Sequence, residues 1–135
     1  MNFATEIIDN GYNNSQIEID DDWETCYGEL VFTSSKFPDP AKMVADLKAM
    51  GFRVTMWIHP FMNELCPSFA AAKQAGYFAK DEDGKTRTRW WNGIAAAIVD
   101  FTNPEATEWF MNKVRAVQQL TQVLHKFCKI VVQSK

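Results

Sequence analysis

The stretch DPAKMVADLKAMGFRVTMWIHP, residues 39–60, decides the fold, because in it a helix pattern gives way to a buried-strand pattern. Asp39 is a favourable helix N-cap, and Pro40 suits the first helical position. Apolar side chains then recur at helical spacing, at Met43, Val44, Leu47 and Met50, and Gly51 ends the pattern. Residues 54–58 are apolar on both faces apart from Thr55, which is typical of a strand buried on both sides in a parallel sheet.

The same alternation extends outward from this stretch. The pattern predicts, in chain order, a helix over residues 1–10 closed by Gly11, a strand over 16–20, a short helix over 67–75, a β-hairpin over 77–90, a third barrel-type strand over 94–100 and a helix from Asn103. The apolar face of the last helix, at Phe110, Val114, Val117, Thr121, Leu124 and Cys128, predicts helix to about residue 128.

Strands that alternate with helices in this way predict an α/β fold with a parallel sheet. The expected architecture is an incomplete (β/α)8 TIM-barrel segment, with about three parallel strands, flanking helices and a small hairpin. The 135 residues are too few for an eightfold barrel, which needs about 250. In such barrels the chemistry lies at the carboxyl ends of the strands, which here carry residues 20–22, His59-Pro60 and Asp100.

Composition excludes several classes of protein. With 47% hydrophobic and 23% charged residues, the chain has the composition of a soluble globular protein and not of a disordered or coiled-coil one. No apolar run approaches the roughly 20 residues of a membrane-spanning helix, and the acidic N-terminal stretch does not resemble a signal peptide. The net charge of -3 gives no electrostatic footprint for nucleic acid. These features leave the compartment open.

The cysteines Cys26, Cys66 and Cys128 are odd in number and widely spaced. This pattern argues against a disulfide framework or a zinc site, so we expect buried, unreactive thiols. The sequence contains no Walker loop, Rossmann glycine pattern, HExxH or nucleophile elbow. No motif therefore predicts a cofactor or a metal site.

The acid triplet at the end of the first predicted strand, Asp20, Asp21 and Asp22, is the candidate site with the clearest chemistry. Paired carboxylates hold sugar hydroxyls well, because each carboxylate accepts charge-assisted hydrogen bonds. A solvated loop is the second interpretation. A metal site is the third, although the triplet lacks the spacing and the glycine of a calcium loop.

Aromatic side chains lie near the other strand ends. Trp57 could be a flat platform for a sugar ring or a core aromatic, and His59 could be a catalyst or a hydrogen-bonded structural imidazole. Trp90 and Trp91 are adjacent, so in an extended segment one could face a ligand while the other packs. Asp100 is expected to hydrogen-bond the backbone of the loop that follows it.

Five ordered motifs together resemble glycoside hydrolase family 31, and the similarity extends over about residues 3–119. They are QIEIDDDW at 16–23, KFP at 36–38, GFRVTMWIHPF at 51–61, WWNG at 90–93 and DFTNPEA at 100–106. The resemblance is nearest to the myogenesis-regulating branch of the family. It implies a (β/α)8 barrel that cleaves α-glucosides or, in this branch, α-galactosides, with retention of configuration and without a metal or other cofactor.

The resemblance also implies roles for individual residues. Asp20 and Asp21 match the strand-end acids that hold sugar hydroxyls, with Glu18 as the alternative. Trp57 and Trp91 match positions that wall the subsite for the sugar to be cleaved. His59 stands where many members of the family carry an aspartate.

The catalytic carboxylates that the family uses are missing. A retaining mechanism needs a nucleophile and an acid/base about 5 Å apart, and the family carries its nucleophile on the strand after the helix that starts here at Pro104. No Asp or Glu occurs from Lys113 to Lys135. We therefore expect no catalytic residue in this chain, a partial family 31 barrel over residues 1–119, and a divergent tail over residues 120–135 that continues the last helix.

The expected function is therefore that of a family 31 glycosidase-like domain that binds α-linked carbohydrate and is inactive alone. The alternative is a non-catalytic sugar-binding or interaction fragment. Sheet edges that a closed barrel would cover are expected to favour association. Neither nucleic acid nor a membrane is an expected partner.

Overall fold

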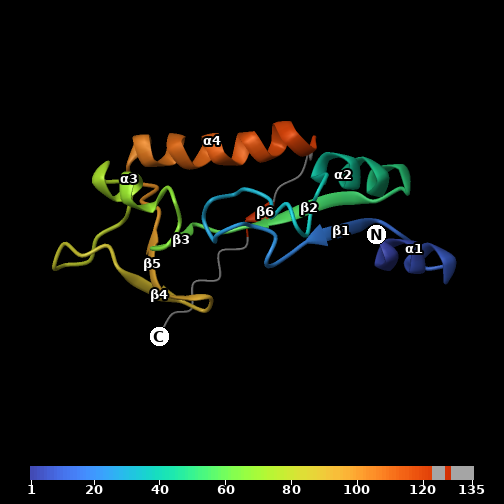
Figure 1. The fold of residues 1–135 in the computed structure, drawn as a ribbon, viewed down its shortest axis with the longest axis horizontal. Helices are drawn as coiled ribbons and strands as arrows, with labels where there is room; N and C mark the ends of the chain where they lie inside the picture. The colour runs from blue at the N-terminus through green and yellow to red at the C-terminus, as the bar shows by residue number, and fades with distance from the viewer. Residues whose placement is uncertain (123–126, 129–135) are drawn as a thin grey trace.

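The computed structural model describes residues 1–122 and 127–128, and it places the helices beside two small sheets (Figure 1). The elements are, in order, α1 (Asn2–Asp9), β1 (Gln16–Ile19), α2 (Pro40–Ala49), β2 (Arg53–Ile58), β3 (Phe61–Asn63), α3 (Phe69–Gln74), β4 (Thr88–Trp90), β5 (Gly93–Ile98), α4 (Pro104–Thr121) and β6 (Phe127–Cys128). Among the helices described, none is both long enough and apolar enough to cross a membrane.

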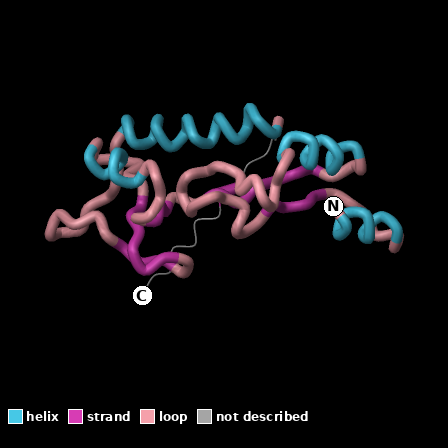
Figure 2. Tube along the Cα trace, viewed as in Figure 1, coloured by secondary structure: helices cyan, strands magenta, loops and turns pink. Residues whose placement is uncertain are grey.

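The first sheet is parallel and has the strand order β1-β2-β6. Gln16 lies opposite Arg53 and Ile19 lies opposite Met56, so the acids after β1 and His59 after β2 leave the sheet at the same end. The central strand β2 is buried from Val54 to Ile58, as its apolar sequence predicts. Helices α2 and α4 lie along one side of this sheet (Figure 2).

The helix starts follow the expected capping chemistry. Asp39 caps α2, since its carboxylate accepts a hydrogen bond of 2.8 Å from the backbone amide of Lys42. Asn103 caps α4, since its side-chain oxygen accepts hydrogen bonds from the amides of Glu105 (2.9 Å) and Ala106 (3.4 Å). The chain after α2 turns through Gly51 at φ +93°, a conformation that favours glycine.

The core joins α4 to the loop that follows β1. The buried face of α4 includes the predicted residues Phe110, Val114, Val117 and Thr121. The side chain of Trp23 has no solvent exposure, and its indole nitrogen donates a hydrogen bond of 2.9 Å to the carbonyl of Trp57. This bond fixes the loop against β2.

The prediction of a third parallel strand over residues 94–100 is wrong. Strand β5 pairs antiparallel with β3 and with β4, in a second sheet of order β3-β5-β4. An apolar sequence indicates that a strand is buried, but it does not determine which strand it pairs with or in which direction. The partner follows from β3, which directly succeeds β2 and provides an edge along which β5 returns.

The expected β-hairpin over residues 77–90 is only partly present. Its turn forms, with hydrogen bonds of 2.9 Å from the Asp81 amide to the Lys85 carbonyl and from the Gly84 amide to the Asp81 carbonyl. Its two arms do not pair with each other, however, because Phe78 forms a bridge with Val99 and β4 pairs with β5. Both arms therefore use β5 and its continuation as their partner.

The C-terminal part of the chain also differs from the prediction. Helix α4 ends at Thr121, where Gln122 takes the left-handed conformation, and Phe127–Cys128 is a strand beside β2 rather than helix. Leu124 and most of the expected tail over residues 120–135 lie outside the described residues. The predicted N-terminal helix over residues 1–10 is confirmed as α1, in which Ala4 is buried while Phe3 is 67% exposed.

We predict that Asn103→Ala lowers the free energy of unfolding by about 1 kcal/mol, because two amides of α4 lose their side-chain acceptor. Urea denaturation followed by far-ultraviolet circular dichroism measures this loss. The control is Gln119→Ala, an exposed position on the same helix, which should change stability by less than about 0.5 kcal/mol. Equal effects of the two variants would contradict the capping role.

Candidate aromatic sugar site

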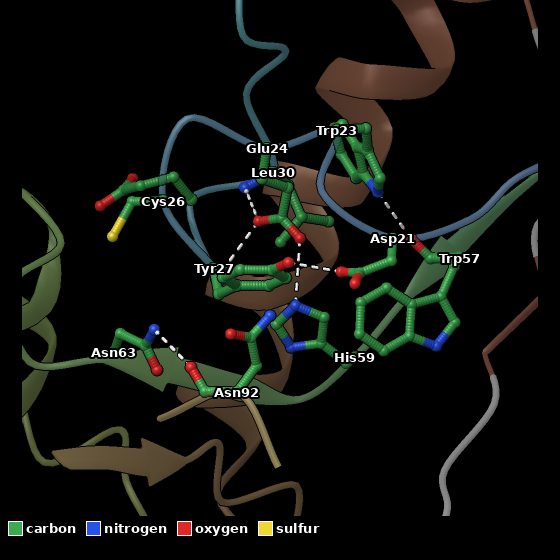
Figure 3. A network of polar contacts seen from close by, with 12 residues as sticks. Asp21, Trp23, Glu24, Cys26, Tyr27, Leu30, Trp57, His59, Asn63 and Asn92 are labelled. Carbon is green, nitrogen blue, oxygen red and sulfur yellow. Dashed lines mark hydrogen bonds and ion pairs between the residues drawn. The ribbon is translucent and has the colours of Figure 1, made fainter. Parts of the chain in front are cut away.

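The site is organised by the buried carboxylate of Glu24, in the loop after β1. Its Oε2 accepts hydrogen bonds of 2.8 Å from the backbone amides of Gly28 and Leu30, and its Oε1 lies 3.1 Å from His59 Nε2 (Figure 3). Both side chains of the Glu24–His59 pair are only 2% exposed. One carboxylate thus shapes the loop and holds it against the end of β2.

The His59 ring belongs to a group of five rings that contact one another. We call this group the aromatic cluster: Tyr27, Trp57, His59, Trp90 and Trp91. The ring centre of Tyr27 lies 5.4 Å from that of Trp90, and 6.4 Å from those of Trp57 and Trp91, in edge-to-face geometry each time. The His59 ring lies 4.6 Å from Trp57 and 4.5 Å from Trp90. Each such pair stabilises the folded state by about 0.5–1.5 kcal/mol in addition to the contribution from buried apolar area.

The carboxylate of Asp21 meets the aromatic cluster at its edge. It accepts a hydrogen bond from the Tyr27 hydroxyl (Figure 3). Burial raises the pKa of Tyr27 above its ordinary value, and the bond to Asp21 and the negative charges of Asp21 and Asp22 raise it further. Tyr27 is therefore a neutral donor at every physiological pH.

The structure brings together four of the five residues predicted for substrate binding. Trp57, His59 and Trp91 belong to the aromatic cluster, and Asp21 is bonded to its Tyr27. Trp57 is buried at 8% exposure, while Trp91 is 68% exposed, so Trp91 presents the open ring of the cluster. Asp20 is exposed next to Asp21, outside the described polar network.

Sequence reasoning assigned no site role to Glu24, Tyr27, Asn63 or Asn92. Asn63 joins two parts of the site, because its side chain accepts a hydrogen bond of 2.9 Å from the Trp90 indole and donates one of 3.5 Å to the Asn92 carbonyl. Local sequence gives no signal for Glu24, because its partner His59 lies at the end of a different strand. None existed for Asn63, whose partners lie 27 and 29 residues away.

The expectation of three free thiols is wrong. Cys26 and Cys66 form a disulfide, with their Cα atoms 5.6 Å apart and 40 residues apart in sequence. An odd count of cysteines obscures a pair, because one unpaired residue is enough to break the pattern. The disulfide joins the Tyr27 loop to the segment that follows β3.

Glu29 anchors the far side of the same loop. Its carboxylate accepts hydrogen bonds of 2.7 Å from both the amide and the hydroxyl of Ser68 and one of 3.0 Å from Lys113. Burial tends to raise the pKa of Glu29, but the bonds from Ser68 and Lys113 outweigh it and hold that pKa below its ordinary value. The loop is therefore tied to both α3 and α4.

Asp100 does what the sequence predicts. Its carboxylate accepts hydrogen bonds from the amide (3.0 Å) and hydroxyl (2.6 Å) of Thr102, and these bonds lower its pKa. Its role is to shape the loop that leads into α4.

A separate hollow of about 510 Å³ lies beside α3 and the turn before β4. It is lined by Glu64, Lys73, Lys80, Gly84, Lys85, Thr86 and Arg87. Nearby acids offset these cations, since Lys85 is 3.0 Å from Asp83 and Arg87 is 3.7 Å from Glu64. The hollow contains none of the residues of the aromatic cluster.

Comparison with known proteins identifies the family of this fold and site. The family model of the glycosyl hydrolases family 31 TIM-barrel domain matches residues 1–129 of this chain. This chain belongs to glycosyl hydrolase family 31. It is 40% identical over 120 residues to the myogenesis-regulating glycosidase of Mus musculus, and 35% identical over 94 residues to an α-xylosidase of Emericella nidulans.

A solved family 31 structure has the same fold. A dextranase of Flavobacterium johnsoniae complexed with glucose superposes with a TM-score of 0.86 at 23% identity, over 94% of this chain and 16% of that one. The two curated relatives are matched over 87% and 68% of this chain, but over only 17% and 12% of their own lengths. The family 31 chain thus spans about a sixth or less of these relatives.

We predict that Glu29→Gln lowers the free energy of unfolding by about 2 kcal/mol at pH 7, because charge-assisted bonds to Ser68 and Lys113 are lost. A folded-state pKa below the unfolded value means that this stabilisation is present above about pH 4.5 and is lost as the pH falls further. The difference between wild type and variant should therefore shrink in acid.

Urea denaturation at pH 7 and at pH 3.5 measures this difference. Glu108→Gln is the matched control, because Glu108 bonds to Arg115 on the exposed surface of α4, where an ion pair contributes little. A Glu29→Gln effect that is the same at both pH values would contradict the prediction.

Proposed function

We propose that this family 31 chain binds α-linked carbohydrate at the aromatic cluster, and that the 135-residue chain does not itself break the glycosidic bond. The observation that carries the proposal is the meeting of Asp21 with Trp57, His59 and Trp91 around Tyr27. Aromatic faces suit the apolar face of a sugar ring, and a carboxylate suits its hydroxyls. Several relatives are named for α-linked sugars, which supports the same substrate class.

The polar atoms at the site support a role in holding hydroxyls. Three buried atoms have no hydrogen-bond partner among the described residues: the Nδ1 and Nε2 of His59 and the Oε1 of Glu24, although Nε2 and Oε1 lie 3.1 Å apart. A buried polar atom without a partner is costly, and a ligand hydroxyl that reached it would remove that cost. Asp20 and Asp21, exposed at the end of β1, would supply carboxylate acceptors at the rim.

The chemical step needs carboxylates that this chain lacks. Among the acids at the site, Glu24 is buried and accepts hydrogen bonds from two amides, and Asp21 is bonded to Tyr27. No acid occurs from Lys113 onward, where the family places its nucleophile. Loss of a covalent nucleophile costs many powers of ten in rate.

We therefore predict no turnover of nitrophenyl α-galactoside or nitrophenyl α-glucoside by the 135-residue chain, because neither a nucleophile nor an acid/base is present. Absorbance of released nitrophenol measures the rate, with an active family 31 glycosidase as the positive control. Turnover by this chain that disappears in Asp20→Ala would overturn the prediction.

We further predict that a methyl α-glycoside binds with a millimolar dissociation constant and shifts the tryptophan fluorescence. Trp91→Ala should weaken binding about tenfold, since it removes the open ring, and tenfold corresponds to about 1.4 kcal/mol. Asp21→Asn and Asp20→Asn, compared under the same conditions, identify which carboxylate holds a hydroxyl. Ile94→Ala, which removes another exposed apolar side chain from β5, is the control and should leave binding unchanged.

A second candidate function is association with another part of a family 31 barrel. Strand β1 pairs only with β2 among the described strands, so its other edge is unpaired there. An unpaired strand edge can pair with a strand of another chain. This supports an interaction role for a chain that spans only 17% of the length of the relative from Mus musculus. Sedimentation velocity at several concentrations tests this candidate, and a monomer with a sharp two-state melt would count against it.

A further inference from the structure

The disulfide between Cys26 and Cys66 lies next to the centre of the aromatic cluster. Cys26 directly precedes Tyr27, and Cys66 follows β3 by three residues. Cys66 is buried at 4% exposure, while Cys26 is half-buried. The covalent link thus ends one residue from Tyr27, which, like Trp90, contacts every other ring of the cluster.

Three further contacts join the same two segments. The Asn63 amide donates a hydrogen bond of 3.0 Å to the Tyr27 carbonyl, and Cys66 Sγ lies 3.2 Å from that oxygen. Gly28 approaches β3 so closely that an added Cβ would lie 2.6 Å from the Cα of Met62. The backbone on both sides of Tyr27 is therefore held against residues 61–66.

The segment over residues 61–66 also carries the opposite wall of the cluster. The side chain of Asn63 bonds the indole of Trp90 and the carbonyl of Asn92, on either side of Trp91. Tyr27 and the two tryptophans are thus positioned from one common base, residues 61–66; Figure 3 shows Asn63 of this base with Tyr27 and Asn92. Water can replace the hydrogen bonds that these residues make, whereas it cannot replace the covalent disulfide.

We propose, on the basis of the function proposed above, that the Cys26–Cys66 disulfide is a positioning element of the carbohydrate site. It holds Tyr27 against Trp90 and Trp91, and its reduction by a dithiol releases Tyr27 and weakens sugar binding. The rings then lose their common orientation while the helices and the parallel sheet stay folded. The affinity for α-linked sugar is therefore higher in an oxidising environment, where disulfides persist.

The redox step is a thiol–disulfide exchange. A thiolate of the dithiol attacks the more accessible sulfur of Cys26, and the bond to the Cys66 sulfur breaks, so that Cys66 leaves as a thiolate. The second thiol of the reductant then resolves the mixed disulfide. Two electrons and two protons pass to the cysteines, and the dithiol becomes its cyclic disulfide.

The experiment titrates the oxidised and the dithiothreitol-reduced 135-residue chain with methyl α-galactoside and methyl α-glucoside, followed by tryptophan fluorescence. Reduction should raise the dissociation constant at least tenfold, while far-ultraviolet circular dichroism stays unchanged. The double variant Cys26→Ser/Cys66→Ser should match the reduced chain and should not respond to dithiothreitol.

A control separates positioning from stability in general. Val44→Ala removes buried volume from α2, far along the chain from Tyr27, and should leave the sugar affinity of the folded protein unchanged. Equal affinity in the oxidised and reduced chains would overturn the proposal. Loss of the helical signal on reduction would also overturn it, because the disulfide would then stabilise the whole fold.

A second readout works without any sugar. Acrylamide quenching of tryptophan fluorescence should increase on reduction of the wild type but not on reduction of Tyr27→Ala, in which the cluster is already open. If no sugar binds in either redox state, the proposed function fails, and quenching alone decides the positioning role. Quenching that is unchanged on reduction of the wild type overturns it.

Discussion

The site depends on one buried carboxylate. Glu24 accepts two backbone amides and faces His59, so it closes the loop after β1 on itself and attaches that loop to β2 in a single interaction. Burying a carboxylate is costly unless it is paired and hydrogen-bonded, and the two amides and the facing His59 offset part of that cost, so they fix the path of the loop. The rings of Tyr27 and Trp57 meet because that path is fixed.

The aromatic cluster lies where two kinds of sheet meet. The parallel sheet presents residues 20–22 and His59 at its carboxyl end, and the antiparallel sheet adds Trp90 and Trp91 from the side (Figure 1). Asn63, at the end of β3, links the two by hydrogen bonds to both the Tyr27 loop and the β4–β5 connection. The aromatic cluster therefore belongs to the junction and to neither sheet alone.

Much of the site was predictable from sequence for a simple reason. The carboxyl ends of parallel strands meet at one edge of a sheet, so the sequence predicts that residues 20–22 and His59 lie at the same end. Tyr27 was not predictable, because it lies in a loop whose shape follows from Glu24, the disulfide and Glu29 together. These links span from 4 to 84 residues, and local patterns carry no information over the longer of them.

The sequence by itself determined the elements whose signals are local: the capped helices α2 and α4, the doubly buried strand β2, and the turn at residues 81–85. It also determined the family, through ordered motifs. Only the tertiary structure decided that β5 runs antiparallel beside β3, that Cys26 bonds Cys66, and that Tyr27 contacts every other ring of the aromatic cluster. The physical reason is that strand pairing, disulfide bonding and ring packing are choices of partner, and a partner distant in sequence is selected by the folded shape as a whole.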